Sequence, residues 1–194
     1  MTTNDDLVPV SQFIAESERN IEIAAAIFEH YEEARAEIVK GFFDRLKKAL
    51  QAKLPGWCFR YSEPFFDTRH GAFDMFKKPW KERYRIRIEA YQYGVSMGFG
   101  VWRDPELVGG IPLSAELLAA VKEDFPRATS RDYFEAEINM TSPAVDWRTP
   151  KALWRIHSDE AFRAEVEALL LQMVTLSEEH IDALVKVADG AKQP

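Results

Sequence analysis

The segment 83–101 constrains the fold of this chain more than any other stretch of its sequence. In Arg83-Tyr84-Arg85-Ile86-Arg87-Ile88, basic side chains alternate with aromatic or aliphatic ones. From Gly94 to Val101, apolar side chains alternate in the same way with glycine and serine. A period of two is typical of a strand that buries one face and exposes the other. The two runs therefore predict an antiparallel β-hairpin, which needs a core on one side.

The pairing of the two runs decides which side chains share a face. A two-residue turn at Tyr91-Gln92 places Ile88 opposite Val95, Ile86 opposite Met97 and Tyr84 opposite Phe99. In this register one face is apolar, whereas a slip by one residue would turn that face toward solvent. The turn lacks the favoured Asn-Gly dipeptide, so a longer loop remains an alternative. The other face carries an arginine strip, defined as Arg83, Arg85 and Arg87, opposite Gly100, Gly98 and Ser96.

Segments with helical periodicity precede and follow the hairpin in the sequence. An apolar stripe between residues 11 and 53 predicts one or two helices, with a break within Ser17–Asn20 as the open alternative. The stripe comprises Ile27, Tyr31, Ala34, Ile38, Phe42, Leu46 and Leu50. We expect a short helix over 115–123 capped by Ser114, and a long helix over 159–188 capped by Ser158. We also expect strands at 57–61 and 133–140 and a loop at 62–80.

These elements predict one α+β domain over residues 1–194, with residues 1–10 as a flexible N-terminus. A small antiparallel sheet would pack against long N-terminal and C-terminal helices. The chain is 46% hydrophobic, which suffices for a core, yet it has no apolar run of the roughly 20 residues that span a bilayer. Its N-terminus lacks the pattern of a secretory signal, and Cys58 is the only cysteine. We therefore expect a cytoplasmic protein without a membrane segment.

The sequence contains no recognisable motif for catalysis, metal binding or a nucleotide cofactor. The four histidines are far apart and form no H-x-x-x-H pattern, and Cys58 between two aromatic residues is typical of a buried structural thiol. Glu135 and Glu137 form a pair of carboxylates, but such pairs on an exposed strand face are more often solvated or ion-paired. We accordingly assign no catalytic residue, no metal ligand and no cofactor.

The most unusual local feature is a basic segment at 77–87, which holds six Lys or Arg against one acid in a chain of net charge −7. Guanidinium groups beside a flat strand suit phosphate or carboxylate ligands. The candidate binding residues are Lys77, Lys78, Trp80, Lys81, Arg83, Arg85 and Arg87. The alternative is a ladder of cross-strand ion pairs with Glu135 and Glu137, which requires the 133–140 strand to neighbour the hairpin.

The order of several short motifs resembles that of a known family. These motifs are Leu54-Pro55-Gly56-Trp57, Phe76-Lys77-Lys78-Pro79-Trp80, Tyr84-Arg85-Ile86-Arg87-Ile88-Glu89, Met97-Gly98-Phe99-Gly100-Val101-Trp102, Asp146-Trp147 and Leu153-Trp154. They resemble the C-terminal region of bacterial and phage-associated proteins of the PD-(D/E)XK nuclease superfamily. The nuclease core of that superfamily needs an E-x-K motif, whereas Glu89-Ala90-Tyr91 lacks the lysine. The resemblance implies an accessory domain without its nuclease, in a phage–host or defence setting.

The function expected from the sequence is a non-catalytic binding module that presents the basic strand face to an acidic partner. A protein partner is the first expectation, a nucleic acid the second, and a homo-oligomer is also open. Two alternatives remain. One is a divergent metal-dependent nuclease that uses Glu89, Glu135 and Glu137. The other is a structural protein whose long helices form a dimer seam.

Overall fold

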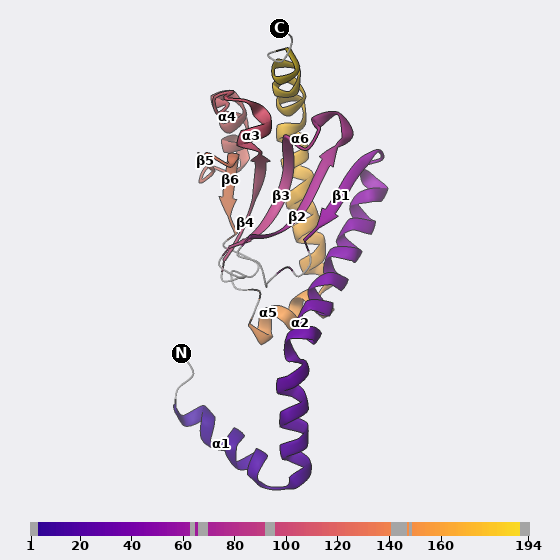
Figure 1. Cartoon of the computed structure of the whole chain (residues 1–194), viewed down its shortest axis with the longest axis vertical. Coiled ribbons are helices and arrows are strands. Elements are labelled where there is room, and N and C mark those ends of the chain that lie inside the picture. Colours follow the sequence, from indigo (N-terminus) through magenta and orange to yellow (C-terminus); the bar gives the residue numbers. More distant parts are fainter. Residues whose placement is uncertain are drawn as a thin grey trace. The chain divides into compact units, whose positions relative to one another are not determined.

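The computed structural model describes residues 4–62, 65, 70–91, 96–140, 147 and 149–190. It confirms the α+β class, with an antiparallel sheet and long helices toward both ends of the chain (Figure 1). The contacts divide the chain into two compact units, Met1–Glu37 and Ile38–Pro194. Within the described residues, no helix combines the length and apolar character needed to cross a membrane.

The first unit holds α1 (Asn4–Ala15) and the beginning of α2 (Glu18–Lys53). The break between two helices expected near Ser17 is confirmed, but α1 begins earlier than the sequence indicated and contains Pro9. Ser17 begins the second helix, since its Oγ accepts a hydrogen bond from the backbone N–H of Asn20 at 3.2 Å. The Asn20 amide donates to the Phe13 carbonyl at 2.6 Å, which ties the two helices together.

The second unit is built on a six-stranded sheet in the order β1-β2-β3-β4-β6-β5, in which every neighbouring pair is antiparallel. The strands are β1 (Trp57–Tyr61), β2 (His70–Lys77), β3 (Tyr84–Tyr91), β4 (Ser96–Arg103), β5 (Thr129–Arg131) and β6 (Phe134–Asn139). A 3-10 turn, η1 (Lys78–Trp80), joins β2 to β3, and α3 (Pro105–Val108) and α4 (Ala115–Asp124) lie between β4 and β5. The chain ends with α5 (Pro150–Ser158) and α6 (Glu160–Gly190).

The hairpin is confirmed, but its register is not the expected one. Ile86 pairs with Val101 and Ile88 with Phe99, and β3 extends to Tyr91. Gln92 and Val95 lie outside the described residues. The shift relative to the expected pairing is an even number of residues, so the same side chains still share a face. The alternation in the sequence determines the face, whereas the length of the turn determines the register.

One face of the sheet carries the core. Figure 1 shows α6 crossing behind the sheet, and α4 contacts both α6 and β6. The later part of α2 adds Phe42, Leu46 and Leu50, all without exposed surface. Phe43 stacks on Phe73 of β2 at 5.0 Å between ring centroids, and burial of such aromatic rings dominates core stability. Among the described residues of the second unit, no helix lies over the opposite face, which we call the open face.

Two expectations about the remaining elements are wrong. The segment 62–80 contains β2. Its alternation of Phe73 and Met75 with Asp74 is hidden in the sequence by Ala72 and Phe76, which are apolar residues on the same side as Asp74. The last helix is not capped by Ser158, which ends the separate helix α5. Asp159 caps α6 instead, since its Oδ1 accepts from the Phe162 N–H at 3.1 Å. The expected cap at Ser114 is confirmed, with its Oγ accepting from the Leu117 N–H at 3.1 Å.

Candidate binding site

The open face of the sheet is charged in its middle, and the charges are paired within the protein. Asp74 of β2 lies directly opposite Arg87 of β3. Its carboxylate accepts hydrogen bonds from Arg87 Nε at 2.7 Å and Nη2 at 3.1 Å, and Arg85 and Arg60 approach it at 3.5 and 3.3 Å. The Asp74 side chain is only 3% exposed. Burial opposes the charged form of Arg87, but the Asp74 and Glu89 carboxylates outweigh it and raise the Arg87 pKa.

The arginine strip is therefore an ion-pair network, but not with the acids expected from the sequence. The strand β6 pairs with β4, and Glu135 and Glu137 pair with Arg103 and Arg131 instead of with the arginine strip. Arg87 lies opposite Gly100 and Arg85 opposite Trp102, in place of the expected Ser96 and Gly98. Their guanidinium carbons lie 4.3 and 4.5 Å from the centroid of the Trp102 ring, as in a cation–π contact.

The other basic candidates connect the sheet to α6. Lys77 pairs with Glu178 at 2.5 Å and Asp182 at 2.8 Å, and Trp80 Nε1 donates to Asp182 at 2.6 Å. Trp80 is fully buried, and Lys78 is exposed. Lys81 and Arg83 both reach Asp189 near the end of α6, at 2.9 and 2.8 Å. Arg83 thus turns away from Arg85 and Arg87, and the three do not form one strip.

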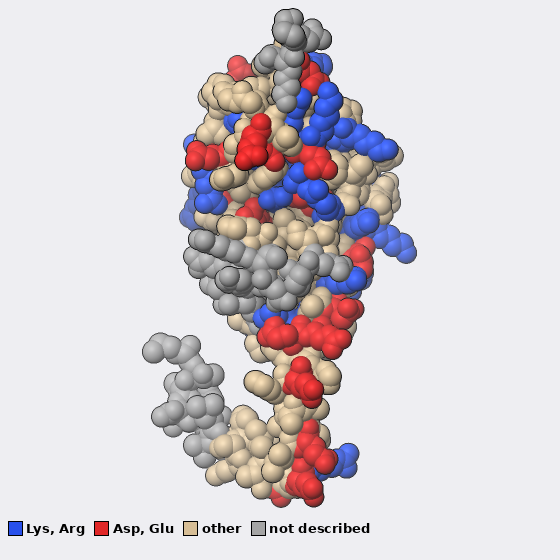
Figure 2. All heavy atoms as spheres, viewed as in Figure 1, with Lys and Arg blue, Asp and Glu red and all other residues tan. Residues whose placement is uncertain are grey.

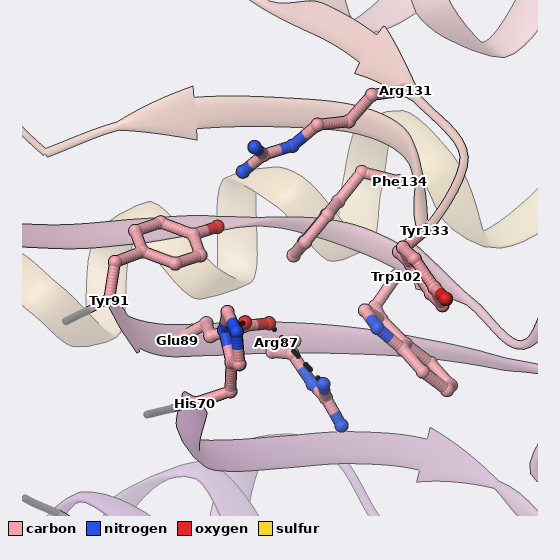
Figure 3. Close-up of a pocket in the computed structure, with 8 residues that line it drawn as sticks. All are labelled: His70, Arg87, Glu89, Tyr91, Trp102, Arg131, Tyr133 and Phe134. Atoms are coloured by element: carbon pink, nitrogen blue, oxygen red, sulfur yellow. Dashed lines mark hydrogen bonds and ion pairs between the residues drawn. The ribbon is translucent and has the colours of Figure 1, made fainter. Parts of the chain in front are cut away.

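An aromatic cavity of about 400 Å³ lies on the open face, where β3, β4 and β6 meet. It is lined by His70, Arg87, Glu89, Tyr91, Trp102, Arg131, Tyr133 and Phe134 (Figure 3). Four of the eight side chains are aromatic, and the volume falls in the range of small-ligand sites. Of the residues singled out from the sequence as binding residues, Arg87 alone is in this lining.

Glycine and a β-bulge shape the floor and wall of the aromatic cavity. A Cβ atom at Gly98 would lie 2.8 Å from Cε2 of Tyr91, so the absence of a side chain lets the tyrosine ring lie across β4. A register shift beside Trp102 places Phe134 opposite Trp102. The bulge also turns the Glu135 side chain away from the cavity. The Glu135 carboxylate accepts hydrogen bonds from Arg103 Nη1 at 2.9 Å and from the Ser114 N–H at 2.7 Å.

Two nitrogen-bearing side chains face each other across the aromatic cavity. Figure 3 shows Arg131 extending over it from β5 on the side opposite His70 of β2. Arg131 is 55% exposed and pairs with Glu137, which also accepts from the Tyr91 hydroxyl. Burial, together with the hydrogen bond to Glu137, raises the pKa of Tyr91, so this hydroxyl stays protonated. Since Arg131 has five N–H donors, donors remain for a ligand.

His70 lines the aromatic cavity on the side opposite Arg131. Its Nδ1 lies 2.7 Å from Oε1 of Glu89, whose other oxygen accepts from Arg87 Nη1 at 3.3 Å. His70 is 56% exposed while Glu89 is 7% exposed, so the carboxylate orients the ring and leaves Nε2 for other contacts. No local sequence pattern indicates His70 as a site residue, because its partner Glu89 is nineteen positions away along the chain.

Comparisons with protein families, curated proteins and solved structures return no match. The chemistry of the site therefore rests on its own geometry. Among the described residues, no group of three or more His, Cys, Asp and Glu side chains is arranged to hold a metal ion. The three carboxylates of the nuclease alternative have separate basic partners: Glu89 has His70 and Arg87, Glu135 has Arg103, and Glu137 has Arg131. The arrangement is thus suited to binding a flat group between aromatic rings, with the guanidinium donors of Arg131 at one edge.

Proposed function

We propose that the chain is a non-catalytic binding module whose ligand enters the aromatic cavity on the open face. The observation that carries this proposal is the combination of four aromatic side chains with Arg131 and His70 on opposite sides of one cavity. Aromatic rings favour a planar group, and the guanidinium of Arg131 favours an anionic or acceptor-rich one. The resemblance to accessory regions of nuclease-superfamily proteins is compatible with such a role.

A nucleotide unit of a single-stranded nucleic acid combines both properties, since each unit has a planar base and a phosphate. Sheet faces that bind single strands use stacking aromatic side chains together with basic ones. None of the twenty unmodified amino-acid side chains combines an aromatic ring with a phosphate group. For this reason we place nucleic acid before the acidic protein partner that the sequence favoured.

The net charge of −7 does not oppose this proposal. Residues 1–37 hold nine acidic and two basic side chains, whereas residues 38–194 hold twenty-three of each. The unit that carries the aromatic cavity is therefore neutral, and Figure 2 shows blue and red side chains interspersed over it. A polyanion would not meet general repulsion at the sheet.

Titration of a labelled ten-nucleotide thymidine strand, followed by fluorescence anisotropy, tests the proposal. Arg131→Gln removes an edge donor, and Tyr133→Ala removes an exposed ring, so each should weaken binding about tenfold. Arg127→Gln is the matched control, because Arg127 is exposed and outside the cavity lining. Equal affinity of all three variants and the parent chain would contradict the proposal. Binding of a polyglutamate peptide, but not of the strand, would favour an acidic protein partner instead.

A further inference from the structure

The first unit exposes large apolar side chains on both of its helices. The apolar stripe of α2 is exposed in the first part of the helix and buried in the later part. Phe42, Leu46 and Leu50 have no exposed surface, whereas Ile27 is 61% exposed and Tyr31 38% exposed. The large exposed apolar residues of this unit are Val10, Phe13, Ile21, Ile23, Ile27, Phe28 and Tyr31. We call this set the N-terminal apolar surface.

An apolar surface of this size on two helices needs a partner. Phe28 alone is 87% exposed, and a helix with a hydrophobic face gains most of its stability by packing that face. The first twenty residues of α2, 18–37, span about 30 Å at the rise of an α-helix. Exposed apolar patches on this scale mark interaction sites.

The charges of the same unit indicate the chemistry of the partner. All of the net charge of the chain lies in residues 1–37, which carry nine acidic side chains and two arginines. At 100° per residue, Glu32 and Glu37 flank the side of α2 that Ile27, Phe28 and Tyr31 share. Glu32 also pairs with Arg35. Figure 2 shows acidic side chains following the early part of α2. The apolar surface is thus bordered by acids.

We infer that the N-terminal apolar surface docks a basic amphipathic helix of a partner protein. Apolar side chains of the partner, repeating every three or four residues, would cover Ile27, Phe28 and Tyr31. Lysine or arginine side chains flanking that repeat would meet the acids of α2, as charged flanks do in paired helices. A second copy of this chain is a poorer occupant, because two units of charge −7 would then lie together.

The test uses the full chain and two labelled 18-residue helical peptides. The first peptide has leucine on one face and lysine on the other, and the second has glutamate in place of every lysine. Anisotropy titrations at about 0.1 M salt, where charges act over about 10 Å, compare the two. The double variant Ile27→Ser with Phe28→Ser removes apolar surface and keeps every acid. Val187→Ser is the matched control, because Val187 is 58% exposed on α6.

The inference predicts that the lysine peptide binds at least tenfold more tightly than the glutamate peptide. The double variant should lose at least tenfold in affinity, and Val187→Ser should bind like the parent chain. Circular dichroism verifies that each variant retains its helices. Undiminished binding of the lysine peptide to the double variant would overturn the inference, since acids alone would then explain it. A dimer in analytical ultracentrifugation that the double variant abolishes would also overturn it, in favour of a second copy. Failure of the lysine peptide to bind the parent chain would likewise overturn the inference.

Discussion

Nδ1 of His70 lies 2.7 Å from Oε1 of Glu89, and through this contact β2 and β3 share one chain of hydrogen-bonded side chains. Glu89 also accepts from Arg87, and Arg87 donates two hydrogen bonds to Asp74. The inner members are buried and the outer one, His70, is exposed at the aromatic cavity. The same network that stabilises the sheet thus positions a side chain for a ligand.

Replacement of Arg87 tests whether this network is structural. Arg87→Gln leaves the buried Asp74 carboxylate with weaker partners, and breaking a buried pair costs about 3–5 kcal/mol of unfolding free energy. We expect about 3 kcal/mol, the lower end, because Arg85 and Arg60 still reach Asp74. Urea denaturation measures the change. Arg127→Gln should stay within about 0.5 kcal/mol of the parent chain. A stable Arg87→Gln protein would show that the network contributes little.

Gly98→Val separates the shape of the aromatic cavity from its charges. The added Cβ would lie 2.8 Å from the Tyr91 ring, which must leave its place across β4 and lose its bond to Glu137. We expect a loss of affinity for the thymidine strand of tenfold or more, with the fold retained, as anisotropy and circular dichroism would measure. Gly41→Ala is the control, since its Cβ would meet only Arg45 Nη1 at 3.6 Å. Wild-type affinity in Gly98→Val would count against this geometry.

The junction between η1 and α6 predicts a pH-dependent contribution to stability. Burial acts to raise the pKa of Asp182, but hydrogen bonds from Lys77 and Trp80 outweigh it and hold the pKa below its ordinary value of 3.8. A lowered pKa in the folded state stabilises the protein above about pH 4, and this contribution disappears as the pH falls through the folded-state pKa. The stability difference between the parent chain and Asp182→Asn should therefore shrink from pH 7 to pH 3. The control Glu179→Gln removes one exposed carboxylate from the same helix and gives the baseline for this comparison. A difference for Asp182→Asn that stays constant from pH 7 to pH 3 would contradict the prediction.

The salt dependence of binding distinguishes the aromatic cavity from a free basic segment. Six unpaired basic side chains would release several counterions, with a slope of about −0.7 in log affinity against log salt per phosphate contact. Because Lys77, Lys81, Arg83, Arg85 and Arg87 already pair with acids, we expect a slope near that of one or two contacts. Anisotropy titrations from 50 to 300 mM salt measure it. A slope of −4 or steeper would indicate that the basic segment binds directly.

The fold could be predicted from the sequence wherever a periodic pattern is local. The alternation around Ile86 and Phe99 identified the hairpin and its apolar face, and Ser114 identified a helix start. The strand β2 does not stand out in the sequence because Ala72 and Phe76 place apolar residues on the same side as Asp74. Asp74 is buried there opposite Arg87, which donates to it. The aromatic cavity could not be predicted, since it depends on which strands become neighbours. A local pattern predicts which face of a strand is buried, whereas the order of the strands in the sheet depends on the whole chain.

Photocrosslinking tests most directly whether a ligand occupies the aromatic cavity. A single strand that contains 5-bromouracil, irradiated with the full chain and digested for mass spectrometry, reports which side chains lie against the base. Our account predicts crosslinks to Tyr91, Trp102 or Tyr133, and their loss in Gly98→Val. Crosslinks confined to the 77–81 segment or to α2, with none at those three residues, would contradict it.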